Sequence, residues 1–369
     1  MSESLRVALL NPTFWPEVQR GSERMIGELA GDLLQLGHAP RVITSHRGRR
    51  ETTHEHGYPI VRNRRPPDAL MQRRGFQEHL SHVPSSYLTL ERGDDDLAHA
   101  FYPTDAAAAL RWARRNGRPA LFSYMGVPQR EVLAGRRLRL RLLLDAVTLS
   151  DAVLALSEAA ATAMRRWLGV DPHVIYPGVD LSRFTPGGER DPQPTIACAA
   201  ASDDSRKRVE LLARAFRHVR RERPDARLLL DRPRRDPSVA ARLEAVSDGI
   251  EFFDAPPGGV AEVFRRAWVS ALPSYNEAFG LVLVEALACG TPAVGTNDGG
   301  IPEIVDRPEV GRLFDGDDEK ALARALLEAL ELASDPATPA RCRERAERFS
   351  TARCAAEHLE LYRALRSAG

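Results

Sequence analysis

Two glutamates in the C-terminal half, Glu277 and Glu285, have the residue type and spacing to hold hydroxyl groups of a ligand. A helical separation of eight residues is at most ~12 Å, too far for a close acid/base pair of carboxyl groups. A helix that starts between them would offer free N–H groups and its positive dipole end to an anion. This arrangement fits an elongated ligand such as a nucleotide sugar. Alternatively, Glu277 complements the helix dipole and Glu285 is a solvated helix residue.

The local sequence predicts the elements that position these two side chains. A strand is expected to end at Leu272, and a helix to cover residues 280–289, where Gly290 and Pro292 stop it. A second strand-to-helix turn is expected at residues 296–303, and its two consecutive glycines permit a close approach of backbones.

The whole chain alternates short apolar runs with helical patterns, which predicts two α/β units in tandem, joined near residues 177–194. Right-handed crossovers would give each unit an open, doubly wound parallel sheet, with ligands at the carboxyl ends of the strands. Strands are predicted at residues 5–10, 41–44, 97–102, 120–124, 152–156, 174–176, 195–200, 227–230, 250–253, 269–272 and 293–296, and helices at residues 22–36, 105–116, 208–222, 260–267, 280–289 and 319–333.

Composition narrows the class of protein. A length of 369 residues suits two domains, and a net charge of +1 gives no basic field that would favour nucleic acid. The four cysteines lack metal-type spacing, so we expect them to be reduced and buried. We see neither a signal peptide nor an apolar run of ~18 residues, and therefore expect a soluble, cytoplasmic protein.

With these motifs in place, the chain resembles glycosyltransferase family 4, a family of retaining enzymes. Its E-x7-E signature is matched by residues 277–285, and further family blocks are similar to residues 20–24, 29–38, 150–158, 176–180 and 299–303, in the same order. The resemblance covers nearly the whole chain. It implies an α/β protein with the GT-B fold, in which two Rossmann-like, doubly wound parallel-sheet domains face each other across a cleft.

The resemblance also implies a division of labour. Residues 1–176 would form an acceptor-binding domain, and residues 177–352 would bind the nucleotide-sugar donor. A final helix over residues 353–369 could pack back on the N-terminal domain.

Individual residues take implied roles from the same resemblance. Glu277 would hold hydroxyl groups of the donor sugar, Glu285 those of the ribose, and Lys207 a phosphate. The implied donor-binding set is Gly21, Arg206, Arg208, Glu277, Ala278, Phe279, Gly280, Leu281 and Glu285, and the implied catalytic set is Glu277, Lys207 and His99. No metal and no cofactor is expected, because the nucleotide sugar is a substrate.

The sequence departs from the family pattern at a cation. The family usually has an arginine five or six residues before the lysine, where this chain has Ser202 and Ala201. Either Arg206 or Arg208 could supply the positive charge that a leaving diphosphate needs. Both could equally be solvated residues at a helix start.

A second departure concerns histidine. Of a family block with two histidines only His99 remains, because Phe101 replaces the other, and Met125 stands at the histidine position of a further block. His99 is therefore a candidate for contacting donor or acceptor. The alternative is a histidine packed at the end of a strand.

Three other segments allow more than one interpretation. Residues 47–74, rich in arginine, fit a solvated loop, or an acceptor-binding or membrane-facing lid. Asp-x-Asp at residues 94–96 and 315–317 holds a metal in another glycosyltransferase fold, but here both lie in turn-like stretches, so metal-independent chemistry is expected. Residues 133–144 fit an ordinary helix better than one on a lipid surface, because Arg136 and the following arginines do not collect on one face; peripheral membrane contact is not favoured.

The expected activity is retaining transfer of a sugar from a nucleotide sugar, with UDP preferred over GDP by family frequency, to an acceptor that the sequence leaves unidentified. A front-face reaction, in which the leaving phosphate accepts the acceptor's proton, needs no enzyme nucleophile. Two alternatives stay open: a related GT-B sugar phosphorylase or nucleotide-sugar epimerase, and a catalytically impaired protein that binds nucleotide sugars.

Overall fold

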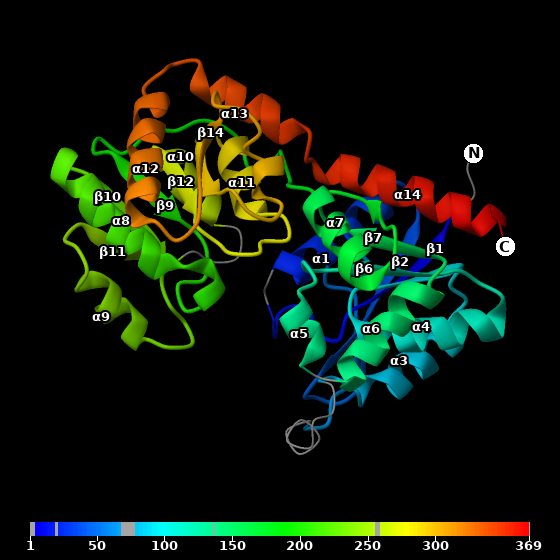
Figure 1. The fold of residues 1–369 in the computed structure, drawn as a ribbon. Helices are drawn as coiled ribbons and strands as arrows, with labels where there is room; N and C mark the ends of the chain where they lie inside the picture. The colour runs from blue at the N-terminus through cyan, green and yellow to red at the C-terminus, as the bar shows by residue number, and fades with distance from the viewer. Residues whose placement is uncertain (1–3, 19–20, 68–77, 136, 255–258, 369) are drawn as a thin grey trace. The chain divides into compact units, whose positions relative to one another are not determined.

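The chain forms two compact units (Figure 1). The computed structural model describes residues 4–18, 21–67, 78–135, 137–254 and 259–368. The first unit comprises residues 1–176 together with residues 351–369, and the second comprises residues 177–350. The last helix of the chain, α14 (Thr351–Ala368), thus belongs to the first unit.

The first unit is built on an eight-stranded sheet in the order β3-β4-β2-β1-β5-β6-β7-β8. All described pairs are parallel except β3 with β4. The strands are β1 (Arg6–Leu10), β2 (Ala39–His46), β3 (Glu51–Thr53), β4 (Ile60–Arg64), β5 (Leu97–Ala100), β6 (Ala120–Tyr124), β7 (Ala152–Ala155) and β8 (His173–Val174).

Helices cover both faces of this sheet. One group consists of α3 (His82–Glu91), α4 (Pro103–Asn116) and α6 (Arg137–Leu149), and α1 (Gly21–Gln35) packs with α14 in a second group. Figure 1 shows α14 and the first group on opposite sides of the strands. Among the described residues of the unit, the remaining helices are α5 (Arg130–Ala134) and α7 (Glu158–Leu168).

The second unit contains a fully parallel six-stranded sheet in the order β11-β10-β9-β12-β13-β14. Its strands are β9 (Thr195–Cys198), β10 (Arg227–Asp231), β11 (Ile250–Phe253), β12 (Val269–Leu272), β13 (Ala293–Thr296) and β14 (Gly311–Phe314). Numbered within the unit, the order is 3-2-1-4-5-6, the Rossmann order. The winding therefore reverses between β9 and β12.

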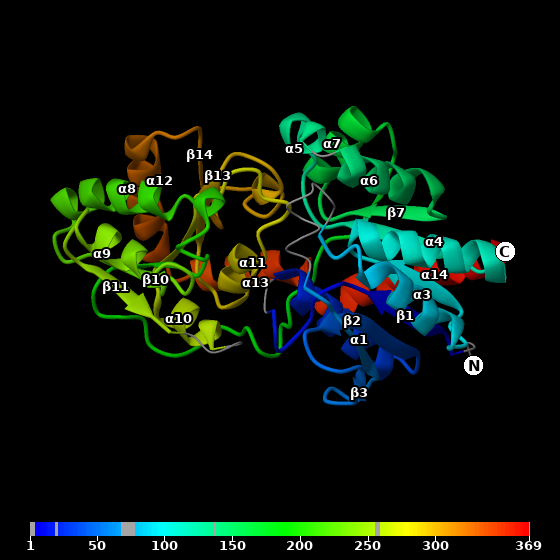
Figure 2. The same cartoon turned by 90° about the horizontal axis from the view of Figure 1, so that it is seen from below.

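The helices of the second unit also form two groups. These are α8 (Val209–Glu222) with α12 (Glu319–Ala333), and α10 (Val260–Arg266) with α11 (Leu281–Ala288) and α13 (Thr338–Glu347). Figure 2 shows α8 and α12 on one side of the strands and α10 on the other. The unit also has α9 (Ser238–Glu244) and two short 3-10 helices, η1 (Ser205–Lys207) and η2 (Ile301–Glu303).

Residue type explains these elements. Every residue of β9 and of β12 is buried, as expected for central parallel strands covered on both faces. In α8 the buried side chains Val209, Leu212, Phe216 and Val219 recur at helical spacing. Apolar periodicity was therefore sufficient to predict the doubly wound α/β architecture, which the structure confirms.

The arginine-rich segment differs from the expectation. Residues 47–74 were expected to be irregular, yet they contain β3 and β4. The sequence does not show the strand because β4 buries the charged Arg62 together with the apolar Ile60 and Val61, which interrupts the apolar run expected of a buried strand. Residues 68–74 lie outside the described residues.

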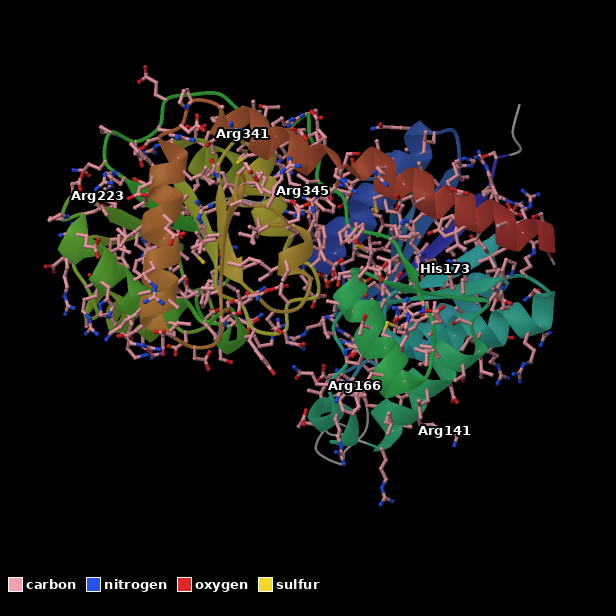
Figure 3. The ribbon with its side chains drawn as sticks, turned by 45° about the horizontal axis from the view of Figure 1, so that its top comes forward. Arg141, Arg166, His173, Arg223, Arg341 and Arg345 are labelled. Atoms are coloured by element: carbon pink, nitrogen blue, oxygen red, sulfur yellow. The ribbon has the colours of Figure 1, made fainter. Side chains whose placement is uncertain are left out.

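The leucine- and arginine-rich segment at residues 133–144 was expected to form an ordinary helix of the domain rather than a helix on a lipid surface, and the structure agrees with this expectation. Residues 133–134 belong to α5 and residues 137–144 to α6, which buries Leu143, Ala146 and Val147. Arg141 extends away from α6 (Figure 3), and Arg136 lies outside the described residues. Among the helices of the described segments, none has the length and apolar character needed to cross a bilayer. All four cysteines are free and buried, as expected.

Helix α14 buries ionisable groups in the first unit. His358 is 2% exposed, its Nδ1 lies 2.8 Å from the carbonyl oxygen of Cys354, and its ring is 5.6 Å from that of His99. Burial lowers the pKa of His358 from the usual 6.5 to about 4. The unfolded chain therefore binds a proton between pH 6.5 and 4 that the folded protein does not bind.

This difference predicts an acid-sensitive first unit. The contribution of His358 to stability is fully present above pH 6.5 and falls as the pH decreases towards 4, by up to about 2 kcal/mol at pH 5. Urea denaturation midpoints at pH 7 and pH 5 should differ less for a His358→Leu variant than for the wild type. His173→Gln, at the exposed His173 labelled in Figure 3, should keep the wild-type difference. Equal differences in all three proteins would contradict the prediction.

Candidate functional site

The reversal of winding between β9 and β12 brings the ammonium group of Lys207 and the carboxylate of Glu277 together. Lys207 ends η1, in the loop after β9, and Glu277 lies in the loop after β12. Nζ of Lys207 donates to Oε2 of Glu277 at 2.5 Å, and the two side chains are only 19% and 15% exposed. Two residues 70 positions apart thus meet at the carboxyl edge, where open α/β sheets bind ligands.

Backbone contacts fix the two loops to each other. The N–H of Tyr275 donates to the carbonyl oxygen of Arg206 at 2.9 Å, and Nε of Arg208 donates to the carbonyl oxygen of Pro273 at 2.6 Å. The position of Lys207 relative to Glu277 is therefore set by several bonds besides their own ion pair.

The two candidate replacements for the missing arginine have different environments. Arg208 also donates to Oγ1 of Thr296 at 2.9 Å and pairs with Asp317, so its guanidinium connects the loops after β9, β12 and β14 with the end of β13. Arg206 is exposed and pairs with Asp204 at 3.0 Å. The guanidinium of Arg208 thus already has protein acceptors, whereas that of Arg206 lies at the surface.

Both residues that adjoin the ion pair have left-handed backbones. Arg208, next to Lys207, has φ of 49°, and Asn276, next to Glu277, has φ of 51°. His79 is the other non-glycine residue with positive φ in the described part of the chain. Such conformations cost of order 1 kcal/mol and concentrate at functional sites.

A third loop, after β13, packs on the loop that carries Glu277. The N–H of Gly300 donates to the carbonyl oxygen of Glu277 at 2.9 Å, and the N–H of Asn276 donates to Oδ2 of Asp298 at 2.6 Å. A Cβ on Gly300 would lie 2.7 Å from the carbonyl oxygen of Ala278 and 2.9 Å from Cα of Phe279. The close approach predicted for the two glycines is thus an approach to the Glu277 loop.

Helix α11 follows this loop and buries the second glutamate. It begins at Leu281, after Gly280 with φ of 111°, close to the predicted start. Glu285 is 1% exposed, so the alternative of a solvated helix residue is wrong: α11 is apolar around its whole circumference and packs inside the unit.

The rest of the loop packs against α13 and the residues that follow it. The buried ring of Phe279 contacts that of Phe349 edge-on at 5.3 Å. Arg345, labelled on α13 in Figure 3, lies 4.8 Å over the Phe349 ring and donates to the carbonyl oxygen of Ile304 at 3.0 Å. The backbone of residues 278–280 therefore rests on a packed support.

One residue of this edge was not singled out from the sequence. Asp231 ends β10, and burial raises the pKa of its carboxyl to about 6. Oγ of Ser202, at a position where the family usually has arginine, donates to the carbonyl oxygen of Asp231 at 2.6 Å. A raised carboxyl pKa close to the point where the winding of the sheet reverses makes Asp231 a candidate functional residue. In the sequence, the feature that could have identified it was its position at the end of an apolar strand.

His99 lies in the first unit, within β5. It is fully buried: Nδ1 lies 2.7 Å from the hydroxyl of Tyr362, and Nε2 lies 2.8 Å from Oγ of Ser123. Its ring stacks on Phe101 at 4.2 Å, and burial lowers its pKa well below the usual value. This geometry corresponds to the packed strand histidine, since both ring nitrogens already contact the protein.

The remaining predicted positions are also described. Gly21 is the exposed first residue of α1 in the first unit, and Arg20 before it lies outside the described residues. In the first Asp-x-Asp, Asp94 and Asp96 both pair with Arg6, and Asp95 between them pairs with Arg41. The described segments contain no group of three or more His, Cys, Asp or Glu side chains arranged to hold a metal ion.

Comparison with protein families assigns both halves of the chain. A model described as Glycosyltransferase Family 4 matches residues 19–183, and a model described as Glycosyl transferases group 1 matches residues 186–349. The chain belongs to glycosyltransferase family 4.

Curated relatives of this family 4 chain are also named as glycosyltransferases. A D-inositol 3-phosphate glycosyltransferase of Streptomyces bingchenggensis is 34% identical over 257 residues, which are 59% of this chain and 55% of the relative. This chain thus spans about half the length of that curated relative.

Solved structures confirm the GT-B fold. Sucrose-phosphate synthase from Thermosynechococcus elongatus has a TM-score of 0.81 at 22% identity, with 99% of this chain and 100% of that chain covered. HepE from Anabaena, solved with UDP-glucose, has a TM-score of 0.74 at 16% identity, with 98% of this chain and 100% of that chain covered.

The contact at Gly300 predicts a sharp steric effect. Gly300→Ala must displace the backbone of residues 278–279, so we expect a loss of about 1–3 kcal/mol in stability and a lower melting temperature. Gly31→Ala in α1 is the matched control, because nothing lies within 4 Å of its Cβ, and it should be neutral or slightly stabilising. Differential scanning calorimetry measures both, and a Gly300→Ala protein as stable as the wild type would contradict the steric explanation.

Proposed function

We propose that this protein transfers a sugar from a nucleoside diphosphate sugar, with UDP preferred over GDP, to an acceptor with retention at the anomeric carbon. The observation that carries the proposal is the contact between Lys207 and Glu277 at the reversal of the second sheet. A cation suited to phosphate and a carboxylate suited to hydroxyl groups lie side by side there. This is the chemistry needed at the bond between sugar and diphosphate.

The donor would exchange partners with this ion pair. A β-phosphate oxygen would accept from the Lys207 ammonium, and a sugar hydroxyl would donate to Glu277. The positive end of the helix dipole of α11, which begins at Leu281, would add positive potential to the same place. Because negative charge grows on the diphosphate as the glycosidic bond breaks, these groups would stabilise the transition state more than the ground state.

The rest of the site would complete donor binding. Glu285, which α11 buries in this structure, would accept from the ribose hydroxyls of the nucleotide once donor binding uncovers its carboxylate. In a front-face reaction the acceptor oxygen forms the new bond on the face from which the diphosphate leaves, and a leaving phosphate oxygen takes the acceptor's proton. No enzyme nucleophile, metal or cofactor takes part in the reaction as proposed.

Replacement of the two lysines tests the phosphate contact. Lys207 and Lys320 are the two lysines of the chain, and Lys320 lies exposed in α12. We expect Lys207→Ala to weaken UDP binding about tenfold or more by isothermal titration calorimetry, since a charge-assisted hydrogen bond is lost. Lys320→Ala should bind UDP like the wild type. Equal UDP affinities for the two variants would overturn the role of Lys207.

A second comparison isolates the sugar contact. Glu277→Gln keeps the size of the side chain but removes the carboxylate charge. It should weaken UDP-glucose binding several-fold relative to UDP binding, whereas Lys207→Ala should weaken both. If Glu277→Gln reduced the two affinities equally, Glu277 would not be the sugar contact.

The stereochemical outcome tests the reaction itself. With a donor and an acceptor that support turnover, proton NMR of the first-formed product should show the anomeric configuration of the donor. An inverted product would refute the front-face reaction. Epimerised donor, or binding without turnover, would favour the epimerase or the non-catalytic alternative.

A further inference from the structure

The guanidinium group of Arg208 packs against the carboxyl edge of the second sheet. It contacts the loop after β12 and the ends of β13 and β14, which are adjacent strands (Figure 2). Buried Thr296 ends β13, and Phe314, whose ring centroid lies 6.0 Å from the guanidinium carbon, ends β14. The side chain of Arg208 is only 16% exposed. It is therefore enclosed by the second unit, although its backbone lies next to the candidate phosphate contact.

Protein oxygens bind all three nitrogen atoms of this guanidinium. Nε donates to the carbonyl oxygen of Pro273 at 2.6 Å, and Nη2 donates to Oγ1 of Thr296 at 2.9 Å. Nη1 donates to the carbonyl oxygen of Gly316 at 3.2 Å and to the carboxylate of Asp317, which balances the charge. A phosphate would have to displace these acceptors before it could bind the same donors.

The backbone of Arg208 connects this anchored side chain to Lys207. Its left-handed conformation, with φ of 49°, ends η1 and begins α8. A non-glycine residue keeps this conformation only where the surrounding structure holds it. Because Lys207 immediately precedes the turn, the direction of its side chain depends on how firmly the turn is held. The contacts of the Arg208 side chain are the fastening.

We propose that Arg208 is a positioning residue for the transfer, which holds the Lys207 ammonium where the β-phosphate of the donor would bind and acts through its contacts rather than its charge. This inference rests on the proposed function, because it concerns the phosphate contact assigned there to Lys207. It replaces the donor-binding role that the family resemblance implied for Arg208.

Two substitutions separate position from charge. Arg208→Gly removes the guanidinium and adopts the left-handed backbone without a steric penalty. Arg208→Lys keeps the positive charge, but one ammonium cannot replace a planar fork that binds several loops at once. Isothermal titration calorimetry should show UDP binding about three- to tenfold weaker in both variants, since the hydrogen bond from Lys207 to phosphate is misaligned. Arg217→Lys, at an exposed position of α8, should bind UDP like the wild type.

The lysine content of the chain gives a direct readout of position. Lys207 and Lys320 are its two lysines, so isotope-labelling lysine at Cε gives one NMR signal for each. In the wild type the Lys207 signal should differ from that of the exposed Lys320, because its ammonium contacts Glu277. Both Arg208 variants should move the Lys207 signal towards that of Lys320. A merely structural role would lower the melting temperature and leave the signal in place.

An acceptor of Arg208 provides a milder test that does not depend on the folding of the Arg208 variants. Thr296→Val removes the hydroxyl that accepts from Nη2, with little change in shape. It should weaken UDP binding about two- to threefold in the wild-type background. In the Arg208→Gly background it should have no further effect on UDP affinity, because the contact is already lost. Losses of affinity that simply add would show that Thr296 does not act through Arg208.

The outcomes separate this inference from the proposed donor chemistry. Wild-type UDP affinity in Arg208→Gly, or a Lys207 signal that neither variant moves, would overturn the positioning role. An affinity that is lost in Arg208→Gly but kept in Arg208→Lys would assign the charge of Arg208 to the phosphate and would also overturn it. A wild type that does not bind UDP would overturn the donor proposal instead, and the Lys207 signal would still report whether Arg208 positions the ammonium.

Discussion

The ion pair between Lys207 and Glu277 depends on the strand order of the second sheet. Because the winding reverses between β9 and β12, the loops that leave these strands are not covered by a crossover helix and can meet. The meeting is then fixed by Arg208, by the backbone bond from Tyr275 and by the glycines after β13. A change in any of these supports alters the geometry of the pair without touching either side chain.

Arginine and lysine have separate roles around this site. Arg208 and Arg345 direct their planar guanidinium groups at backbone carbonyl oxygens, where several donors in a fixed fork can bind several acceptors at once. These arginines act as connectors between loops. A compact ammonium, by contrast, can change partner by rotating a flexible stem, which suits Lys207 to a position where a substrate must replace Glu277.

The local sequence was sufficient to predict the central strands and the start of the helix at the site, because these depend on interactions between residues close in sequence. Buried apolar runs located β9 and β12, and Gly280 located the start of α11, because burial and backbone freedom act within a few residues. The environment of His99 was beyond such reasoning, since its partner Tyr362 lies 263 residues away. The strand β4 was hidden by Arg62, whose buried guanidinium is satisfied by Glu55, seven residues before it, and by the carbonyl oxygen of Trp15, 47 residues before it. The roles assigned to Gly21, Glu277 and Glu285 remain predictions.

The return of α14 to the first unit makes the order of synthesis matter. During translation the first 176 residues emerge well before the helix that completes their core, with the whole second unit made in between. Until Tyr362 and His358 leave the ribosome, the sheet face around His99 lacks its cover. The nascent first unit is therefore a partly open intermediate, and the second unit can reach its final packing earlier although it is encoded later.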